Sequence, residues 1–272
     1  MIHTADLVTL LGITAAVGWG ISDFFSAKSA KALGGLLGAV TITTAAAVFY
    51  GTIYLLFLQA HHNLPIAGFG YAVAASVLIS IANTTFSIGL EAGPVSIVSP
   101  LSSMYPVITT ILALVVFSAT LSGHEIIGIA LVVLGIVATS GLLTIKKSQR
   151  RLGKGPAYAL LTALAWGIGY AMLAQAIKRA DWQIVSVVEL TVSAIMLMFT
   201  LPFVKSKETI SKKMIIKGLH NKYVLSAALV QTLAFMAINL GLSKSTASGG
   251  AVITALSAWL PHTNHIARIE AL

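Results

Sequence analysis

Apolar residues occur in this chain as long blocks, which short polar or basic stretches separate. No Asp, Glu, Lys or Arg occurs in 32–90, 92–124 or 155–177. A helix that crosses the hydrocarbon core of a bilayer needs about 20 apolar residues. A helix that packs on a soluble core would carry a polar face, and these blocks lack one. The pattern therefore predicts an all-α polytopic membrane protein.

The blocks predict nine membrane spans, five in the first half of the chain and four in the second. The one clear linker is the basic stretch 146–154, so we expect one unit at 1–145 and another at 155–272. The expected spans lie near 7–27, 34–58, 66–90, 95–118, 124–145, 156–177, 183–204, 223–243 and 246–261.

The second half repeats motifs of the first half in the same order. Many membrane transporters build a substrate site at the midplane from such internal repeats. The repeated motifs are Ala16–Ile21 (AVGWGI), which returns 147 residues later at Ala163–Ile168 (ALAWGI), Ile88–Leu90 (IGL), which returns at Leu240–Leu242 (LGL), and Leu101–Pro106 (LSSMYP), which returns at Leu256–Pro261 (LSAWLP).

The second repeat stops after Pro261, whereas Pro106 of the first repeat is followed by a further complete span. We therefore expect a chain that is truncated relative to a ten-helix ancestor and lacks the tenth span. A genuine nine-helix protein is the alternative.

The composition agrees with a membrane protein, and its charge suggests an orientation. The chain is 57% hydrophobic and 9% charged, and it has no cysteine. If nine spans alternate, 14 of the 17 basic residues fall on one side. Basic loops stay in the cytoplasm, so the amino terminus should lie outside. The net charge of +9 then reflects topology and contact with anionic lipid, and we expect no nucleic-acid partner.

The repeated motifs resemble those of the drug/metabolite transporter superfamily, in particular its EamA-type members. The resemblance rests on the Trp-Gly of each first helix, the Gly-Leu that ends each third helix, and a small, polar fourth helix that closes on Pro106 or Pro261. It implies two inverted five-helix repeats around a central cavity, which the first four helices of each repeat line. It also implies a cytoplasmic amino terminus, which is opposite to the orientation that the charge count favours.

Two acidic residues lie inside predicted spans. A carboxylate near the bilayer centre costs about 2.5–3.5 kcal/mol, so it needs a compensating role. Asp23 shares a helical stripe with Trp19, Ser22 and Ser26, which suggests a cavity that binds a polar or cationic solute and exchanges a proton. Solvation near the helix end, or a pair with Lys28, is the alternative. Tyr170 occupies the matching position of the second repeat.

Glu189 is the second acid, for which we expect a counter-charge or proton-relay role. An ion pair with Lys178 or Arg179 is its alternative. The polar residues of the third and eighth spans, Asn83, Thr84, Ser87, Gln231 and Asn239, either join helices or hydrogen-bond a solute. Trp19 and Trp166 either stack on a solute or fill the bundle.

The fourth span carries Pro100, Tyr105 and Pro106. We expect a kinked helix there, because proline removes backbone hydrogen bonds, and its role is either gating or packing. The pattern Gly89-xxx-Gly93 lies near a helix end. Together these features predict a solute pathway lined by Trp19, Asp23, Ser87, Tyr105, Trp166, Tyr170, Glu189 and Asn239.

The predicted function is secondary transport, and specifically export, of small polar metabolites such as amino acids, or of drugs, across the plasma membrane. Sugar or nucleotide-sugar transport, and a truncated protein without transport activity, are the alternatives. A homodimer is possible. We expect no enzyme activity, because the catalytic motifs of hydrolases and nucleotide-binding loops are absent. We also expect no cofactor and no metal, since His61 and His62 lack a third ligand.

Overall fold

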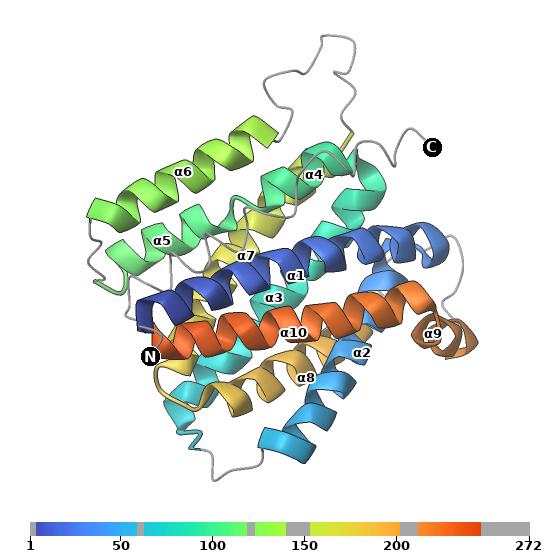
Figure 1. Cartoon of the computed structure of the whole chain (residues 1–272). Coiled ribbons are helices and arrows are strands. Elements are labelled where there is room, and N and C mark those ends of the chain that lie inside the picture. The colour runs from blue at the N-terminus through green and yellow to red at the C-terminus, as the bar shows by residue number, and fades with distance from the viewer. Residues whose placement is uncertain (1–3, 59–62, 119–122, 140–152, 202–211, 246–272) are drawn as a thin grey trace.

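The computed structural model describes residues 4–58, 63–118, 123–139, 153–201 and 212–245, and the regular structure in these ranges is helical. Figure 1 shows long helices that lie across one another in a single bundle. The helices are α1 (Thr4–Leu33), α2 (Gly35–Ile53, continued by a π-helical turn at Tyr54–Leu58), α3 (Ile66–Ala92), α4 (Val95–Ser102), α5 (Tyr105–Val115), α6 (Gly123–Thr139), α7 (Gly155–Ile177), α8 (Trp182–Thr200), α9 (Lys212–Leu219) and α10 (Lys222–Lys244).

Seven helical segments among the described residues are long and apolar enough to cross a membrane, which confirms the polytopic all-α prediction. The described part of α6 has 17 residues and overlaps the fifth predicted span at 124–139. The ninth predicted span, 246–261, is outside the described residues. The seven segments are Asp6–Leu33, Gly35–Leu58, Ile66–Ala92, Ile97–Val115, Gly155–Ile177, Trp182–Thr200 and Lys222–Lys244.

The two halves of the chain exchange their most extensive helix contacts. The first helix of each half packs along the third helix of the other half, so that α1 pairs with α10 and α7 pairs with α3. Figure 1 shows α1 and α10 side by side, and it shows α1 and α7 running in opposite senses. The second helices, α2 and α8, contact each other. The two halves are therefore joined chiefly by the contacts of their first and third helices.

Small residues allow the helices to come close. A Cβ atom at Gly155 of α7 would lie 2.7 Å from the Cα of Gly93, and one at Gly18 of α1 would lie 2.8 Å from the Cβ of Ala234 in α10. Close backbone approach matters in lipid, because the acyl chains are as apolar as the helices and only packing and hydrogen bonds favour association. The Gly89-xxx-Gly93 pattern therefore lies at the contact between α3 and α7.

The fourth predicted span, 95–118, is one membrane-spanning segment, Ile97–Val115, that a short turn divides into α4 and α5. The chain turns at Ser103 and Met104, where the Met104 amide donates to the Leu101 carbonyl at 3.2 Å. Pro106 lies in the first turn of α5, a position where the missing N–H has no helical partner in any case. The kink predicted in this span is thus present, and it lies at Ser103 and Met104, just before the helical segment that Pro106 begins. The turn brings Tyr105, at the start of α5, to the bundle interior, where it is 5% exposed.

Candidate functional site

A cavity of about 140 Å³ lies in the middle of the bundle. One water needs only about 10–15 Å³ of such space, so the cavity has room for a small solute. Its walls come from both halves of the chain. The lining residues are Trp19, Ser22, Asp23, Ser26, Ala30, Gly35, Ala39, Ile42, Thr43, Ile79, Asn83, Phe86, Ser87, Leu90, Ser103, Tyr105, Trp166, Tyr170, Glu189, Leu190, Ser193, Gln231 and Phe235.

Seven of the eight residues predicted for the pathway line this cavity, and Asn239 does not. Asn239 is fully buried, and its Nδ2 donates to Ser186 Oγ of α8 at 2.7 Å. Gln231 and Phe235, earlier on α10, face the cavity in its place. The structure therefore places Asn239 outside the lining of this cavity and gives it the helix-joining role, since its amide links α10 to α8. The seven are Trp19, Asp23, Ser87, Tyr105, Trp166, Tyr170 and Glu189.

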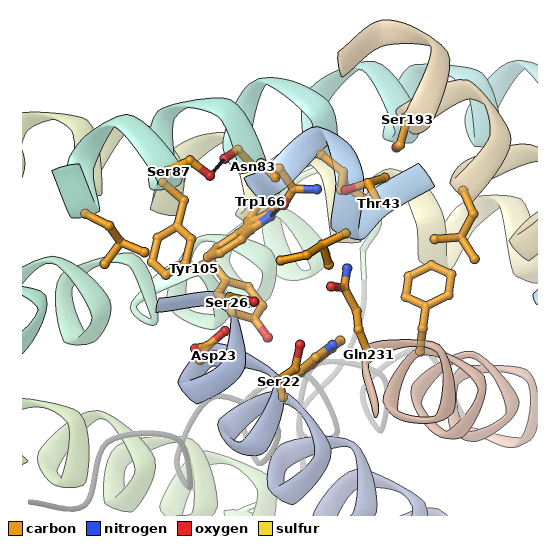
Figure 2. A pocket seen from close by; sticks show the side chains of 18 of the residues that line it. Ser22, Asp23, Ser26, Thr43, Asn83, Ser87, Tyr105, Trp166, Ser193 and Gln231 are labelled. Carbon is orange, nitrogen blue, oxygen red and sulfur yellow. Dashed lines mark hydrogen bonds between the residues drawn. The ribbon is translucent and has the colours of Figure 1, made fainter. Parts of the chain in front are cut away.

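A polar stripe on α1 forms one wall. Figure 2 shows Ser22, Asp23 and Ser26 on this helix. Among the described residues, no hydrogen bond or ion pair reaches the Asp23 carboxylate. The alternative of a pair with Lys28 was wrong, because the Lys28 ammonium lies 4.8 Å from the centre of the Phe24 ring and 5.6 Å from that of Tyr223. The Asp23 carboxylate is therefore available to the contents of the cavity.

Glu189 contributes the second carboxylate, from α8. The residue is 1% exposed. Its Oε1 accepts a hydrogen bond from Ser193 Oγ at 3.1 Å, while Oε2 has no partner among the described atoms. The alternative of an ion pair with Arg179 was wrong, since that guanidinium donates to Oε1 of Gln175 at 2.6 Å and lies over the Tyr71 ring. Lys178 is exposed beyond the end of α7.

Five aromatic rings follow one another along the cavity, and we call them the aromatic row. The ring centres of Trp19 and Tyr170 are 5.9 Å apart, and those of Tyr170 and Tyr105 are 5.2 Å apart in a stacked pair. Tyr105 then meets Trp166 at 5.8 Å, and Trp166 meets Phe86 at 5.2 Å. Because all five also line the cavity, the two tryptophans both pack on neighbouring rings and face the open space.

Asn83 fixes the position of one ring. Its Oδ1 accepts a hydrogen bond from Trp166 Nε1 at 3.1 Å, and its backbone carbonyl accepts one from Ser87 Oγ at 2.9 Å. Figure 2 shows Asn83 and Ser87 together on the α3 side of the cavity. Asn83 therefore joins two helices and lines the cavity as well, so the two roles considered for it are compatible.

Several lining residues had no signal in the sequence. Thr43 and Phe86 lie in uncharged segments that contain several hydroxyl side chains, and nothing in the sequence singles out either residue among its neighbours. Ser103 is brought to the cavity by the turn between α4 and α5. Phe235 corresponds to Asn83 in the other repeat, at the offset of 152 residues that relates the third helices. Only this repeat correspondence could have indicated it.

The cavity extends toward one end of the bundle. Ala30, Gly35 and Leu90 line it where α1 and α3 end and α2 begins. At the opposite end, loops join the helices: the Asn63 amide donates to Asp181 Oδ2 at 2.7 Å, and the Asp181 amide donates to the Asn63 carbonyl at 3.2 Å. The cavity thus approaches the end that carries α9 and the basic residues around it.

Comparison with known proteins agrees with this architecture. The chain is 28% identical to an uncharacterized transporter of Archaeoglobus fulgidus over 200 residues, which cover 71% of this chain and 68% of that protein. It is 30% identical to an uncharacterized protein of Methanocaldococcus jannaschii over 138 residues, 50% of this chain and 97% of that protein.

A solved crystal structure shares the fold, with a TM-score of 0.54 at 14% identity over 97% of this chain and 98% of that chain. The family description that matches is the EamA-like transporter family, over residues 7–141 and 153–260. These matched residues make up most of the chain. The protein is thus an integral membrane protein, and it belongs to the EamA-like transporter family.

Proposed function

We propose that this protein is a secondary transporter that carries small polar metabolites or drugs through the central cavity. The observation that supports this most directly is the position of the cavity between the two halves. Sites of this kind lie at the interface of structural repeats, and one repeat rocks against the other to give alternating access. Both halves here contribute polar side chains to one space inside an otherwise apolar bundle.

The proposed direction of transport is export across the plasma membrane. The cavity extends toward the end of α1, where Lys28 and Lys31 lie, and α9 with Lys213 and Lys217 lies at the same end. Basic segments stay in the cytoplasm, so a cytoplasmic solute would reach the cavity in this conformation. The chain has no nucleotide-binding loop, and a proton or solute gradient would supply the energy.

Asp23 and Glu189 are the residues we propose for coupling. An intramembrane carboxylate that faces a wet cavity can exchange a proton, and neither carboxylate is neutralised by a lysine or arginine among the lining residues. Asparagine or glutamine at these positions would keep the shape and remove the charge. The same lining, with its hydroxyls and amides, also suits a sugar, which is the second candidate within transport.

Proteoliposomes test the proposal. The purified protein is reconstituted, and uptake of labelled amino acids, sugars, amines and lipophilic cations is measured under an imposed proton gradient. We expect flux of at least one class, and its loss in Asp23→Asn and Glu189→Gln. Asp6→Asn is the matched control, because this carboxylate lies exposed in the first turn of the same helix as Asp23. No flux for any class would contradict the transport function.

A further inference from the structure

The ionisable side chains of the cavity are all acidic or phenolic. Asp23 and Glu189 are its two carboxylates, Tyr105 and Tyr170 are its two phenols, and no Lys, Arg or His is among its lining residues. An anionic solute would meet two like charges without a counter-charge. A zwitterion would leave its own carboxylate without a cationic partner, which is costly in a low-dielectric interior. A cation would be attracted by both carboxylates, Asp23 on α1 and Glu189 on α8.

One carboxylate oxygen of Glu189, Oε2, lacks a hydrogen-bond donor among the described atoms. The side chain of Glu189 is 1% exposed and lines the cavity. A buried oxygen without a partner costs free energy, more so when it belongs to a charged group. The cationic groups nearest in sequence, Lys178 and Arg179, are exposed beyond the end of α7. A cationic solute in the cavity would supply the partner that Oε2 lacks among the described atoms.

The aromatic row offers a second kind of attraction. Tyr170 lies between the rings of Trp19 and Tyr105, and Trp19 is one helical turn before Asp23 on α1. A cation within about 6 Å of a ring centre is attracted by the ring quadrupole, most strongly for tryptophan and by more when water is excluded. Rings and carboxylates around one space make the chemistry that recognises alkylammonium and quaternary ammonium groups.

We propose that the cavity selects small organic cations, which bind between the carboxylates of Asp23 and Glu189 with their alkyl groups against the aromatic row. This inference rests on the proposed transport function and narrows its substrate class. The volume of about 140 Å³ limits the solute to a compact amine. Neutral molecules of the same shape keep the contacts with the rings and lose both the charge attraction and the cation–π term.

Calorimetry on the purified protein in detergent, near neutral pH, tests the proposal with matched probes. Choline is compared with 3,3-dimethylbutan-1-ol, in which carbon replaces the charged nitrogen, and with 3,3-dimethylbutanoate as the anion. We expect choline to bind at least about tenfold more tightly than either. A cation–π contact of about 1–2 kcal/mol lowers the dissociation constant by roughly that factor, and attraction to a carboxylate acts in the same direction. Quenching of tryptophan fluorescence gives a second readout, because Trp19 and Trp166 line the cavity.

Substitutions then test whether Asp23 and Glu189 cause the preference for choline over the neutral probe. Asp23→Asn and Glu189→Gln should each weaken choline binding at least about tenfold and leave the neutral probe unchanged, while Asp6→Asn should change neither. If a variant fails to fold, the order of affinities of the three probes for the unaltered protein still tests whether the cavity prefers a cation. Equal or tighter binding of the neutral or anionic probe overturns the proposal, and so does the absence of choline binding.

The two proposals fail in different ways. Flux of neutral or anionic solutes without a preference for choline would leave the transport function standing and overturn the cation selectivity. Choline binding that depends on the two carboxylates, without flux of any solute, would leave the binding site standing and overturn the transport function.

Discussion

Asp23 and Tyr170 occupy equivalent positions of the two repeats, and their side chains line the same cavity. The positions are 147 residues apart, the offset that relates the Trp-Gly motifs of the two first helices. One repeat therefore presents a carboxylate where the other presents a phenol that belongs to the aromatic row. The repeated scaffold is therefore symmetric at this pair of positions while its side-chain chemistry is not, and the carboxylate that the second half contributes comes from Glu189 on α8 instead.

The polar stripe of α1 predicts a pattern of chemical accessibility. The chain has no cysteine, so single cysteines can be introduced without background. We expect Ser26→Cys, which faces the cavity, to react with a small water-soluble thiol reagent. Ile21→Cys should react far more slowly, because Ile21 is 46% exposed on the outer surface of the bundle, where lipid would cover it. The opposite ranking would mean that α1 is rotated and that the cavity is not the water-filled path.

The two carboxylates predict a dependence on pH with a definite sign. Protonation removes the negative charge, so acidification should weaken choline binding, and neutralisation by Glu189→Gln should make binding both weaker and less sensitive to pH. The other titratable groups that line the cavity are Asp23, Tyr105 and Tyr170, and the phenols stay neutral near neutral pH. Binding titrations at several pH values check this. An unchanged pH profile in the variant would exclude Glu189 from proton exchange.

Gly167 predicts a packing effect at the wall of the cavity. A Cβ atom there would lie 2.5 Å from Ile108 Cβ and 3.0 Å from the Tyr105 carbonyl oxygen. Gly167→Ala should therefore push α5 away from α7 and destabilise the protein by about 1–3 kcal/mol, measured as a loss of thermal stability in detergent. Gly70→Ala is the control, since nothing lies within 4 Å of its Cβ position. Equal effects of the two substitutions would contradict this assignment.

The hydroxyls of Thr85 and Thr162 join α3 to α7 at 2.8 Å. Interhelical hydrogen bonds in membrane proteins contribute only about 0.6 kcal/mol on average. We expect a coupling free energy of unfolding near that value from the cycle of Thr85→Val, Thr162→Val and the double variant. One hydroxyl donates to the other, and each also has a carbonyl of its own helix within donor distance. The hydroxyl that loses its partner can therefore donate to that carbonyl and is not left unsatisfied. A coupling above about 2 kcal/mol would show a larger polar network than the structure contains.

The basic end of the bundle predicts the orientation. With that end in the cytoplasm, Lys217→Cys on α9 should be labelled by an impermeant reagent only from the inside. Asn63→Cys, in the loop before α3 at the opposite end, should be labelled only from the outside. Labelling of sealed cells and of inverted vesicles checks both positions. The reverse result would place the amino terminus in the cytoplasm and would make import the direction in which this conformation is open.

The sequence by itself determined the class of fold and indicated seven of the residues that line the cavity. Long uncharged blocks leave only membrane helices as a stable solution, because lipid offers backbone groups no other hydrogen-bond partner. The free-energy cost of a carboxylate in lipid singled out Asp23 and Glu189 without any coordinates, and the repeated Trp-Gly motifs indicated Trp19 and Trp166.

Only the tertiary structure decided which face of each helix the cavity uses. Asn239 was as polar as Ser87, its counterpart in the first repeat, yet its amide bonds Ser186 on α8. Thr43, Phe86 and Phe235 line the cavity although nothing in their local sequence distinguishes them. The hydrophobic pattern cannot choose between faces of a uniformly apolar helix. That choice comes from the close contacts between α1 and α10 and between α3 and α7, whose small residues set the rotation of each helix.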